Sequence, residues 1–288
     1  MRMIDFHSHI LPNVDDGSKS VEETFELLEE AKNAGFEGVI STSHYMEGYY
    51  EVDVAERKVW INALSESLYK KNIDLKLYLG NEIYLTENLI NLLENGKATS
   101  INNSNYVLFE FPLNSKPMNM YDIIYDMLEY KLIPILAHPE RYSFVQKEPE
   151  LVYDLIQKGV LMQSNFGSII GRYGEKAELI VRKLLENNMV HFWGSDVHKA
   201  NTIYPRIGEA LDIIKEIVGR EKLEELTTIN PKLVLENRRI DIDEPRKFKL
   251  SLKEKMIVNL KKWNNTKKRK CFKHFLSFFL IKTWIFSH

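Results

Sequence analysis

The sequence predicts an α/β fold in which parallel strands form a closed or nearly closed barrel covered by helices. Short apolar runs alternate with helical patterns through the first 240 residues. Seven such runs are present, and they are not obviously two-faced, as expected for strands that are buried on both sides. A doubly wound open sheet is the alternative, but no Gly-rich phosphate loop follows the first run.

The expected strands are the apolar runs that end at turn signals. They cover residues 3–6, 38–43, 75–80, 106–111, 133–137, 160–164 and 189–194. The first helix is expected over residues 21–33, because Ser20 and Glu23 form a capping box and Gly35 is a helix stop. The later helices are expected, from the spacing of apolar residues, over residues 52–71, 118–130, 151–158, 176–187, 208–218 and 221–226.

The chain divides into an acidic body and a basic tail. From Arg246 to the end there are 13 Lys and Arg against one acid, a net charge of +12, whereas the 26 basic and 40 acidic residues before it leave −14. A body this acidic argues against nucleic acid as a general partner, and the tail is suited to an anionic surface. No internal repeat or linker precedes the composition change at residues 241–245. We therefore expect one domain over residues 1–240 and a separate tail over residues 241–288.

Composition also restricts the compartment and the chemistry. The hydrophobic content of 44% is enough for a core and excludes disorder as the main state. The first ten residues lack an apolar run long enough for a secretory signal, and the first 245 have no uncharged apolar stretch of 18 residues. We therefore expect a soluble, cytoplasmic body. Cys271 is the sole cysteine, which excludes an intramolecular disulfide framework and a cysteine zinc site. A cysteine phosphatase is excluded as well, because that chemistry needs an arginine six residues later and position 277 is a serine.

Imidazole and carboxylate side chains fall at the C-terminal ends of the expected strands. They are His7, His9, His44, Glu82, Glu110, His138, Asp196 and His198. Taken singly, each of these residues is more often structural than metal-binding. Taken together they predict a metal site, because the C-terminal ends of parallel strands converge on one face of a barrel. There the side chains would repel one another or stay protonated unless cations were bound. His191 lies inside the last strand and is interpreted as a core residue.

Several motifs in residues 1–238 resemble the polymerase and histidinol phosphatase (PHP) superfamily. They are His7-Ser8-His9, Asp15-Asp16-Gly17, Ser43-His44, Gly80-Asn81-Glu82, Glu110-Phe111, Ala137-His138-Pro139-Glu140-Arg141 and Gly194-Ser195-Asp196-Val197-His198. Within the superfamily, the sequence most resembles the bacterial metal-dependent protein-tyrosine phosphatases that are encoded with capsule and exopolysaccharide genes.

The resemblance implies a distorted (β/α)7 barrel of the TIM type with a centre of three metal ions, usually manganese. Iron, zinc and magnesium are alternatives. It implies that the eight residues named above are the metal ligands. It further implies that Asp16 is the acidic residue of the family's Asp-Asp-Gly turn and that Arg141 faces the phosphate. A second arginine of the family maps to Arg206, although its spacing from Asp196-Val197-His198 is longer than usual.

The implied substrate is the autophosphorylated tail of a membrane-bound bacterial tyrosine kinase that controls polysaccharide synthesis. A hydroxide that bridges divalent ions is the expected nucleophile, because the metals lower the pKa of water and neutralise phosphoryl charge. Arg141 offers a planar fork to the phosphate, and Asp16 either protonates the leaving phenolate or orients a ligand. Residues Tyr45, Met46, Tyr49 and Tyr50 are candidates to line an open peptide cleft.

Two other functions remain open. One is a small-molecule phosphatase of the histidinol phosphate type. The other is a non-catalytic metal-binding module that docks a kinase. This hypothesis would require some of the metal ligands to have been lost, and all eight are present. A homo-oligomer is compatible with either.

The tail has a helical apolar stripe with lysines opposite it over residues 249–263 and an aromatic-rich segment over residues 272–286. This pattern predicts a peripheral membrane anchor at the inner face of the membrane. Docking on the acidic body and disorder are the alternatives.

Overall fold

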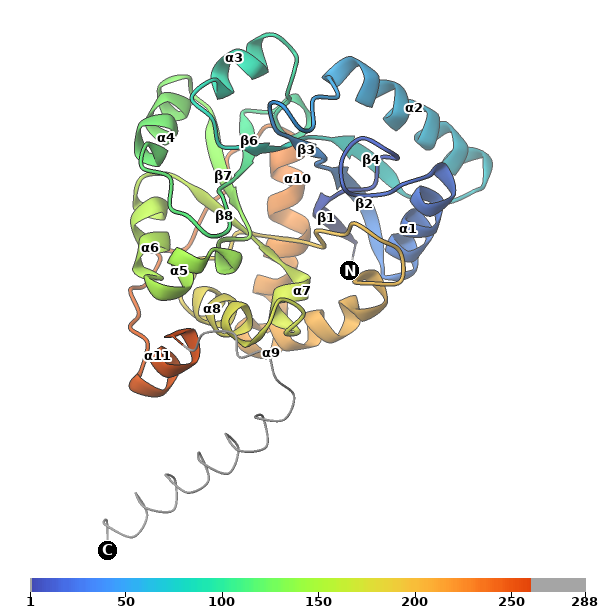
Figure 1. The fold of residues 1–288 in the computed structure, drawn as a ribbon. Helices are drawn as coiled ribbons and strands as arrows, with labels where there is room; N and C mark the ends of the chain where they lie inside the picture. The colour runs from blue at the N-terminus through green and yellow to red at the C-terminus, as the bar shows by residue number, and fades with distance from the viewer. Residues whose placement is uncertain (1, 260–288) are drawn as a thin grey trace, which may run out of the picture.

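A curled sheet of parallel strands lies at the centre of the molecule, and helices surround it (Figure 1). The computed structural model describes residues 2–259. In this part of the chain one sheet has the order β1 (Met3–Ser8), β2 (Phe36–Ser41), β4 (Lys76–Leu79). A second sheet has the order β3 (His44–Tyr45), β5 (Glu82–Tyr84), β6 (Tyr106–Glu110), β7 (Ile133–Ala137), β8 (Leu161–Asn165), β9 (Phe192–Gly194).

Backbone hydrogen bonds join the two sheets into a barrel. The amide of Glu82, the first residue of β5, donates to the carbonyl of Thr42, just after β2, at 2.9 Å. On the other side, the amide of His9 donates to the carbonyl of Val197 at 3.0 Å, which connects β1 to the segment after β9. The predicted barrel of parallel strands is confirmed, and the open-sheet alternative is wrong.

Two short strands were not predicted. The chain changes from one sheet to the other at Thr42-Ser43, between β2 and β3, and again at Gly80-Asn81, between β4 and β5. Strands of two or three residues are too short to produce a recognisable alternation in sequence. The strand expected over residues 38–43 corresponds to β2, which begins and ends two residues earlier, and β3 and β5 are additions.

The longer helices lie close to where they were predicted, whereas helices of four to six residues were missed. The helices are α1 (Val21–Asn33), α2 (Val54–Lys70), α3 (Leu89–Glu94), α4 (Met120–Glu129), α5 (Ser143–Lys147), α6 (Glu150–Gln157), α7 (Phe166–Ile169), α8 (Glu175–Glu186), α9 (Ile207–Glu224), α10 (Asn230–Leu235) and α11 (Leu252–Asn259). Ser20 Oγ accepts from the Glu23 amide at 3.2 Å, as the capping box requires. Gly219, at φ +82°, breaks α9 between the two helices predicted there.

Apolar side chains fill the N-terminal half of the barrel. The rings of Phe6 and Phe192 stack at 4.2 Å and pack with Ile4, Leu108 and Ile135 in one buried cluster. This layer excludes water below the site. The C-terminal ends of the strands are left to polar side chains.

The first part of the basic tail packs on the body. Leu250 and Val258 are 7% and 3% exposed and belong to the main apolar cluster. Lys176 Nζ donates to the carbonyl of Val258 at 2.5 Å, and Lys183 pairs with Glu254 at 3.3 Å. Docking on the body therefore holds for residues 250–259. The rest of the predicted anchor lies outside the described residues.

Truncation measures how much this contact contributes. A chain that ends at residue 240 loses the burial of Leu250 and Val258, so we expect its free energy of unfolding to fall by about 3–5 kcal/mol. A chain that ends at residue 259 keeps both side chains and is expected to match the full chain. Urea unfolding of the three proteins provides the measurement. Equal stability of all three would instead support the division at residue 240, which stays a prediction.

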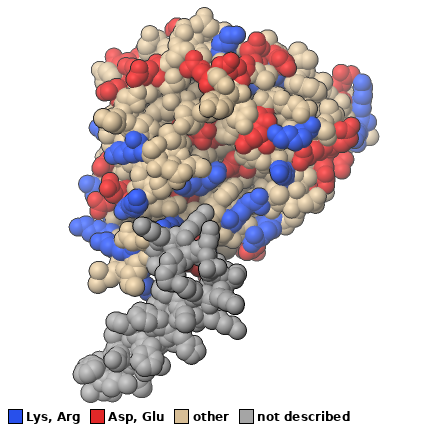
Figure 2. All heavy atoms as spheres, viewed as in Figure 1, with Lys and Arg blue, Asp and Glu red and all other residues tan. Residues whose placement is uncertain are grey.

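No helix in residues 2–259 has the length and apolar character needed to cross a membrane. Asp and Glu side chains are spread over much of the face in Figure 2, with Lys and Arg between them.

Candidate metal centre

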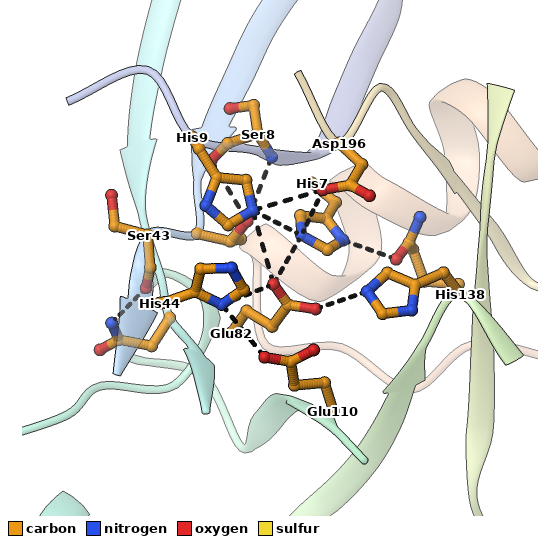
Figure 3. A network of polar contacts seen from close by, with 12 residues as sticks. His7, Ser8, His9, Ser43, His44, Glu82, Glu110, His138 and Asp196 are labelled. Atoms are coloured by element: carbon orange, nitrogen blue, oxygen red, sulfur yellow. Dashed lines mark hydrogen bonds and ion pairs between the residues drawn. The ribbon is translucent and has the colours of Figure 1, made fainter. Parts of the chain in front are cut away.

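The eight side chains predicted as ligands meet at the C-terminal end of the barrel. Figure 3 labels all of them except His198. They come from six strands or the residues directly after them: β1 supplies His7, β3 supplies His44, β5 supplies Glu82 and β6 supplies Glu110. His138 directly follows β7 and Asp196 follows β9. The convergence that the sequence implied is therefore present.

Glu82 lies at the centre of the cluster and is fully buried. Its Oε2 is 3.0 Å from His44 Nδ1, 3.2 Å from His7 Nε2 and 3.4 Å from His9 Nε2. Its Oε1 is 2.8 Å from His138 Nε2. One carboxylate thus faces four imidazoles with both of its oxygens, so Glu82 would be able to hold more than one cation.

Three overlapping groups of side chains could each hold an ion. Their ligand atoms lie within 4.8 Å of one another, and the groups are His7-His9-Glu82, His44-Glu82-Glu110 and His9-Asp16-His44-His198. Asp16 enters the third group through Oδ1, which is 3.2 Å from His198 Nε2 and 3.5 Å from His44 Nε2.

The hydrogen bonds of His7 and His9 leave their Nε2 lone pairs pointing into the cluster. His7 Nδ1 donates to the side-chain oxygen Oε1 of Gln163 at 2.8 Å, and His9 Nδ1 donates to the carboxylate of Asp15 at 2.7 Å. The two Nε2 atoms are then 3.0 Å apart. Two lone pairs at this distance repel unless a proton or a metal ion lies against them. The residues therefore fit a divalent metal by their donor chemistry.

The backbone around the site is shaped for this convergence. His138 and Asp196 adopt left-handed conformations, with φ of 33° and 52°. Gly17 follows Asp15-Asp16, and a Cβ at this position would lie 2.2 Å from the carbonyl oxygen of His9. Only glycine lets the loop fold this closely over the first strand.

Charge pairing fixes the protonation of the metal-free cluster. Burial alone would raise the pKa of Glu82, but the surrounding histidines hold it well below its usual value. Burial would also raise the pKa of Asp196, and the charges of Arg141 and His7 hold it well below as well. Burial lowers the pKa of His44, but the charge of Glu82 and the hydrogen bonds to Glu82 and Glu110 together outweigh burial and raise this pKa to about 10. Without metal, imidazolium groups take the place of cations.

The metal-free protein is therefore expected to lose stability as the pH rises. The carboxylates have folded pKa values below their unfolded ones, so their contribution is complete above about pH 4.5 and is lost on acidification. His44 has a folded pKa above its unfolded one, so its contribution is complete below about pH 6.5 and is lost towards pH 10. Metal ions bind neutral imidazole and should restore stability on the alkaline side.

Thermal unfolding in chelator and in excess Mn²⁺, at pH 6 and at pH 9, checks this prediction. The melting temperature in chelator should be lower at pH 9, and the gain from metal should be larger there. A metal-free protein that is equally stable at both pH values would contradict it.

The two candidate arginines occupy different environments. Arg141 Nη1 donates to Asp196 Oδ2 at 2.5 Å, and its guanidinium carbon lies 4.5 Å from the ring centre of Tyr173. Arg206 lies in the 3₁₀ helix Tyr204–Arg206 with 45% of its side chain exposed, and its Nη2 is 2.8 Å from Glu209 Oε2. The structure thus brings Arg141, but not Arg206, into contact with the cluster.

The aromatic residues after His44 divide between core and surface. Tyr45 is 4% exposed and belongs to the main apolar cluster, so its predicted place in a substrate cleft is wrong. The alternation of the strand turns its side chain away from the side of His44. Tyr50 stacks on His44 with ring centres 5.7 Å apart, and Tyr49 is 75% exposed. His191 is buried as predicted, and its Nδ1 accepts from the Met162 amide at 2.9 Å.

Several residues that support the site were missed from the sequence. Asp15 holds His9, and Gln163 and Asn165 contact His7 and Asp196. Asp5 accepts from the amide and hydroxyl of Ser195 at 2.7 and 2.6 Å and so anchors the segment that carries Asp196. Gln163 and Asn165 did leave a signal, because two amides at positions i and i+2 of an apolar run share one face of a strand.

Comparisons with known proteins agree with this geometry. Residues 3–236 match the family model for capsular polysaccharide synthesis proteins CpsB/CapC. The chain is 34% identical over 249 residues to the putative tyrosine-protein phosphatase CapC of Staphylococcus aureus, covering 84% of this chain and 95% of that protein. It is 32% identical over 247 residues to the tyrosine-protein phosphatase YwqE of Bacillus subtilis strain 168, covering 86% and 97%.

Solved structures show the same architecture. A structure from the work on YwqE from Bacillus subtilis and CpsB from Streptococcus pneumoniae, described as metal-dependent tyrosine phosphatases, superposes with a TM-score of 0.81 at 32% identity. The match covers 86% of this chain and all of that one. The histidinol phosphate phosphatase of Lactococcus lactis has a TM-score of 0.52 at 16% identity, over 76% and 95% of the two chains, which shows a shared fold alone.

Proposed function

The chain belongs to the CpsB/CapC family of capsular polysaccharide synthesis proteins, and from this premise we infer that it is a metal-dependent protein-tyrosine phosphatase that acts in capsule synthesis. The observation that carries this function is the cluster around Glu82, at the same end of the barrel where such folds build their active sites. The relatives match over nearly their whole length, so the activity belongs to the part of the chain that is shared.

We propose that the cluster holds three Mn²⁺ ions through His7, His9, His44, Glu82, Glu110, His138, Asp196 and His198. Five imidazoles and three carboxylates without a thiolate suit Mn²⁺. Fe, Zn and Mg ions are the alternatives for the same set of donors. The three overlapping donor groups support the number of ions. Divalent ions bound there lower the pKa of water towards neutrality and offset negative charge on phosphoryl oxygens.

The protein's own side chains bind and orient the phosphate. Arg141 has five N–H donors in the plane of its guanidinium group, and the contact with Asp196 uses one of them, so further in-plane donors remain for phosphoryl oxygens. The hydrogen bond with His198 lowers the pKa of Asp16, which keeps this carboxylate ionised near neutral pH. Of its two predicted roles, we therefore favour the orientation of His198 and His44 over proton donation. A phenolate leaving group, with a pKa of about 10, needs little acid help.

The substrate assignment is tested by comparing phosphomonoesters at equal Mn²⁺. A phosphotyrosine peptide should be hydrolysed with a much higher kcat/KM than histidinol phosphate or phosphoserine. A preference for histidinol phosphate would overturn the assignment in favour of the small-molecule phosphatase. Absence of turnover on phosphotyrosine and on p-nitrophenyl phosphate, with metal bound, would favour a docking module.

We propose that the physiological substrate is the phosphorylated tail of a membrane-bound tyrosine kinase and that the enzyme acts in the cytoplasm. Membership of a capsule-synthesis family of tyrosine phosphatases supports a tyrosine kinase as partner. Dephosphorylation of a purified kinase tail, with the phosphatase and kinase expressed together in cells as a second arm, tests this proposal.

We also propose that the basic, aromatic end of the chain contacts anionic lipid. The net charge of +12 from residue 246 onwards supports this interaction. The full chain should sediment with vesicles that contain phosphatidylglycerol, and less so at high salt, whereas a chain that ends at residue 259 should stay in solution. Equal sedimentation of the two proteins would contradict the proposal. Turnover of p-nitrophenyl phosphate should be the same for both.

A further inference from the structure

Strand β8 contributes none of the eight predicted ligands, yet two of its side chains are turned into the site. Gln163 and Asn165 are two residues apart, lie on the same face of the strand and are completely buried. Burying two amides costs free energy unless their donors and acceptors are paired. Their contacts therefore indicate what the strand does.

The two amides form a continuous chain of hydrogen bonds between His7 and Asp196. His7 Nδ1 donates to Gln163 Oε1 at 2.8 Å, and Gln163 Nε2 donates to Asn165 Oδ1 at 3.0 Å. Asn165 Nδ2 then donates to Asp196 Oδ2 at 2.7 Å. All three bonds run in the same direction and end on a carboxylate, so each one polarises the next.

The direction of these hydrogen bonds determines which ring nitrogen of His7 carries the proton. A carbonyl oxygen opposite Nδ1 requires that this nitrogen carry the proton, which leaves the Nε2 lone pair facing Glu82 and His9. If Gln163 turned its amide over, its NH₂ group would face Nδ1 and the proton of His7 would move to Nε2, inside the cluster. The bond to Asn165 opposes this reversal because it uses the NH₂ group of Gln163.

At its other end, this series of hydrogen bonds fixes the orientation of the Asp196 carboxylate. Its Oδ2 accepts from both Asn165 and Arg141, whereas its Oδ1 lies 3.5 Å from His9 Nε2 and 3.7 Å from His7 Nε2. One oxygen is thus held by the protein and the other is directed at the cluster. Because Arg141 shares Oδ2, the orientation of the phosphate-binding side chain depends on the same bonds.

Packing leaves Gln163 little freedom to reorient. A Cβ at Gly194 would lie 2.9 Å from Gln163 Nε2 and 2.5 Å from His7 Cβ, so the glycine backbone presses against both. The backbone amide of Asn165 donates to Glu140 Oε1 at 3.0 Å, which ties the end of β8 to the turn that carries Arg141. The Gln163 side chain is therefore restricted by Gly194, and the backbone that carries the Asn165 side chain is held by Glu140.

We propose that Gln163 and Asn165 are positioning residues that fix the tautomer of His7 and the rotamer of Asp196, and so set the affinity of the centre for metal. This inference rests on the proposed metal-dependent function, but it concerns how the ligands are oriented. It predicts that β8 acts on metal affinity while it makes no contact with the metal itself.

The test compares two substitutions of nearly equal volume. Gln163→Met removes the acceptor for His7 and the donor for Asn165, whereas Gln163→Glu keeps the acceptor for His7 and loses only the donor for Asn165. Gln157→Met, on the exposed end of α6, is the matched control. Affinity for Mn²⁺ is measured on the metal-stripped full chain by competition with a chelator, and thermal unfolding of the stripped proteins is measured in parallel.

We expect Gln163→Met to weaken Mn²⁺ binding by about 10- to 100-fold, the range found when a partner of a metal-bound histidine is removed. Gln163→Glu should recover part of the affinity, because it keeps the bond to His7 alone, and Gln157→Met should not change the affinity. In NMR spectra of the ¹⁵N-labelled, Zn²⁺-loaded proteins, the signal of the proton on His7 Nδ1 should be visible for the wild type and for Gln163→Glu. In Gln163→Met this signal should be lost by exchange with water.

Unchanged metal affinity in Gln163→Met would overturn the proposal. So would equal weakening in the Glu and Met variants with an equal loss of thermal stability, because this pattern would indicate packing alone. Metal binding is measured without substrate, so these outcomes are independent of the phosphatase assay. A protein that binds Mn²⁺ through these residues but does not hydrolyse phosphotyrosine would refute the proposed function and leave this inference intact.

Discussion

Replacing Glu82 with glutamine should reduce kcat/KM for a phosphotyrosine peptide by about 1,000-fold or more and should leave the purified protein depleted of metal. The substitution keeps the size of the side chain but removes the negative charge that faces four imidazoles at 2.8 to 3.4 Å. Metal ions contribute several kcal/mol to phosphoryl transfer, and each 1.36 kcal/mol corresponds to tenfold in rate, so loss of the centre has an effect of about this size.

Elemental analysis of metal, steady-state kinetics and circular dichroism on the same preparations give the measurement. Glu236→Gln is the control, because this exposed carboxylate pairs with Arg238 and belongs to none of the groups of candidate ligands. His138→Ala, which removes the partner of Glu82 Oε1, should also lose metal and nearly all turnover while it stays folded. A Glu82→Gln protein with full metal content and normal turnover would rule out the cluster as the catalytic centre.

Arg141→Lys should lower kcat/KM by about 100-fold while most of the metal is retained. Lysine keeps the positive charge but has a single ammonium group in place of the planar fork, so it cannot bond both Asp196 and a phosphoryl oxygen in the same plane. Removal of one preorganised donor to a developing oxyanion typically costs 100- to 1,000-fold, which sets the expected magnitude.

Arg206→Lys provides the matched comparison. Arg206 is half exposed and pairs with Glu209 one turn along the chain, so we expect its substitution to change kcat/KM by less than about twofold. An equal loss in both variants would instead support the second phosphate contact that the resemblance implied. A normal rate for Arg141→Lys would remove the role proposed for Arg141.

The candidate ligands could be predicted because their chemistry is tied to strand ends. His7 and His9 flank Ser8 at the end of an apolar run, and Glu110 ends another such run between two phenylalanines. Each position is unusual for its residue type, and parallel strands bring such positions together. The first helix was also predicted with the bounds Val21–Asn33, because Ser20 and Gly35 are local signals that need no tertiary contact.

Other features depend on contacts between residues that are distant in sequence. The bond from His9 to Asp15 requires the turn at Gly17 to fold over the first strand, and the chain from Gln163 to Asp196 joins β8 to the end of β9. The different environments of Arg141 and Arg206 arise in the same way, since both follow a strand and only one turns towards Asp196. Short strands such as β3 carry too few residues for a periodic pattern.

The amino-acid sequence by itself determined the alternation of strands and helices, the acidic body, and which imidazoles and carboxylates gather at one end of the barrel. Tertiary structure alone decided which atoms of those side chains face one another, which hydrogen bonds orient them, and which arginine reaches them. The physical reason is that strand position and residue type are local properties, whereas the direction of a lone pair is set by partners that folding brings from elsewhere in the chain.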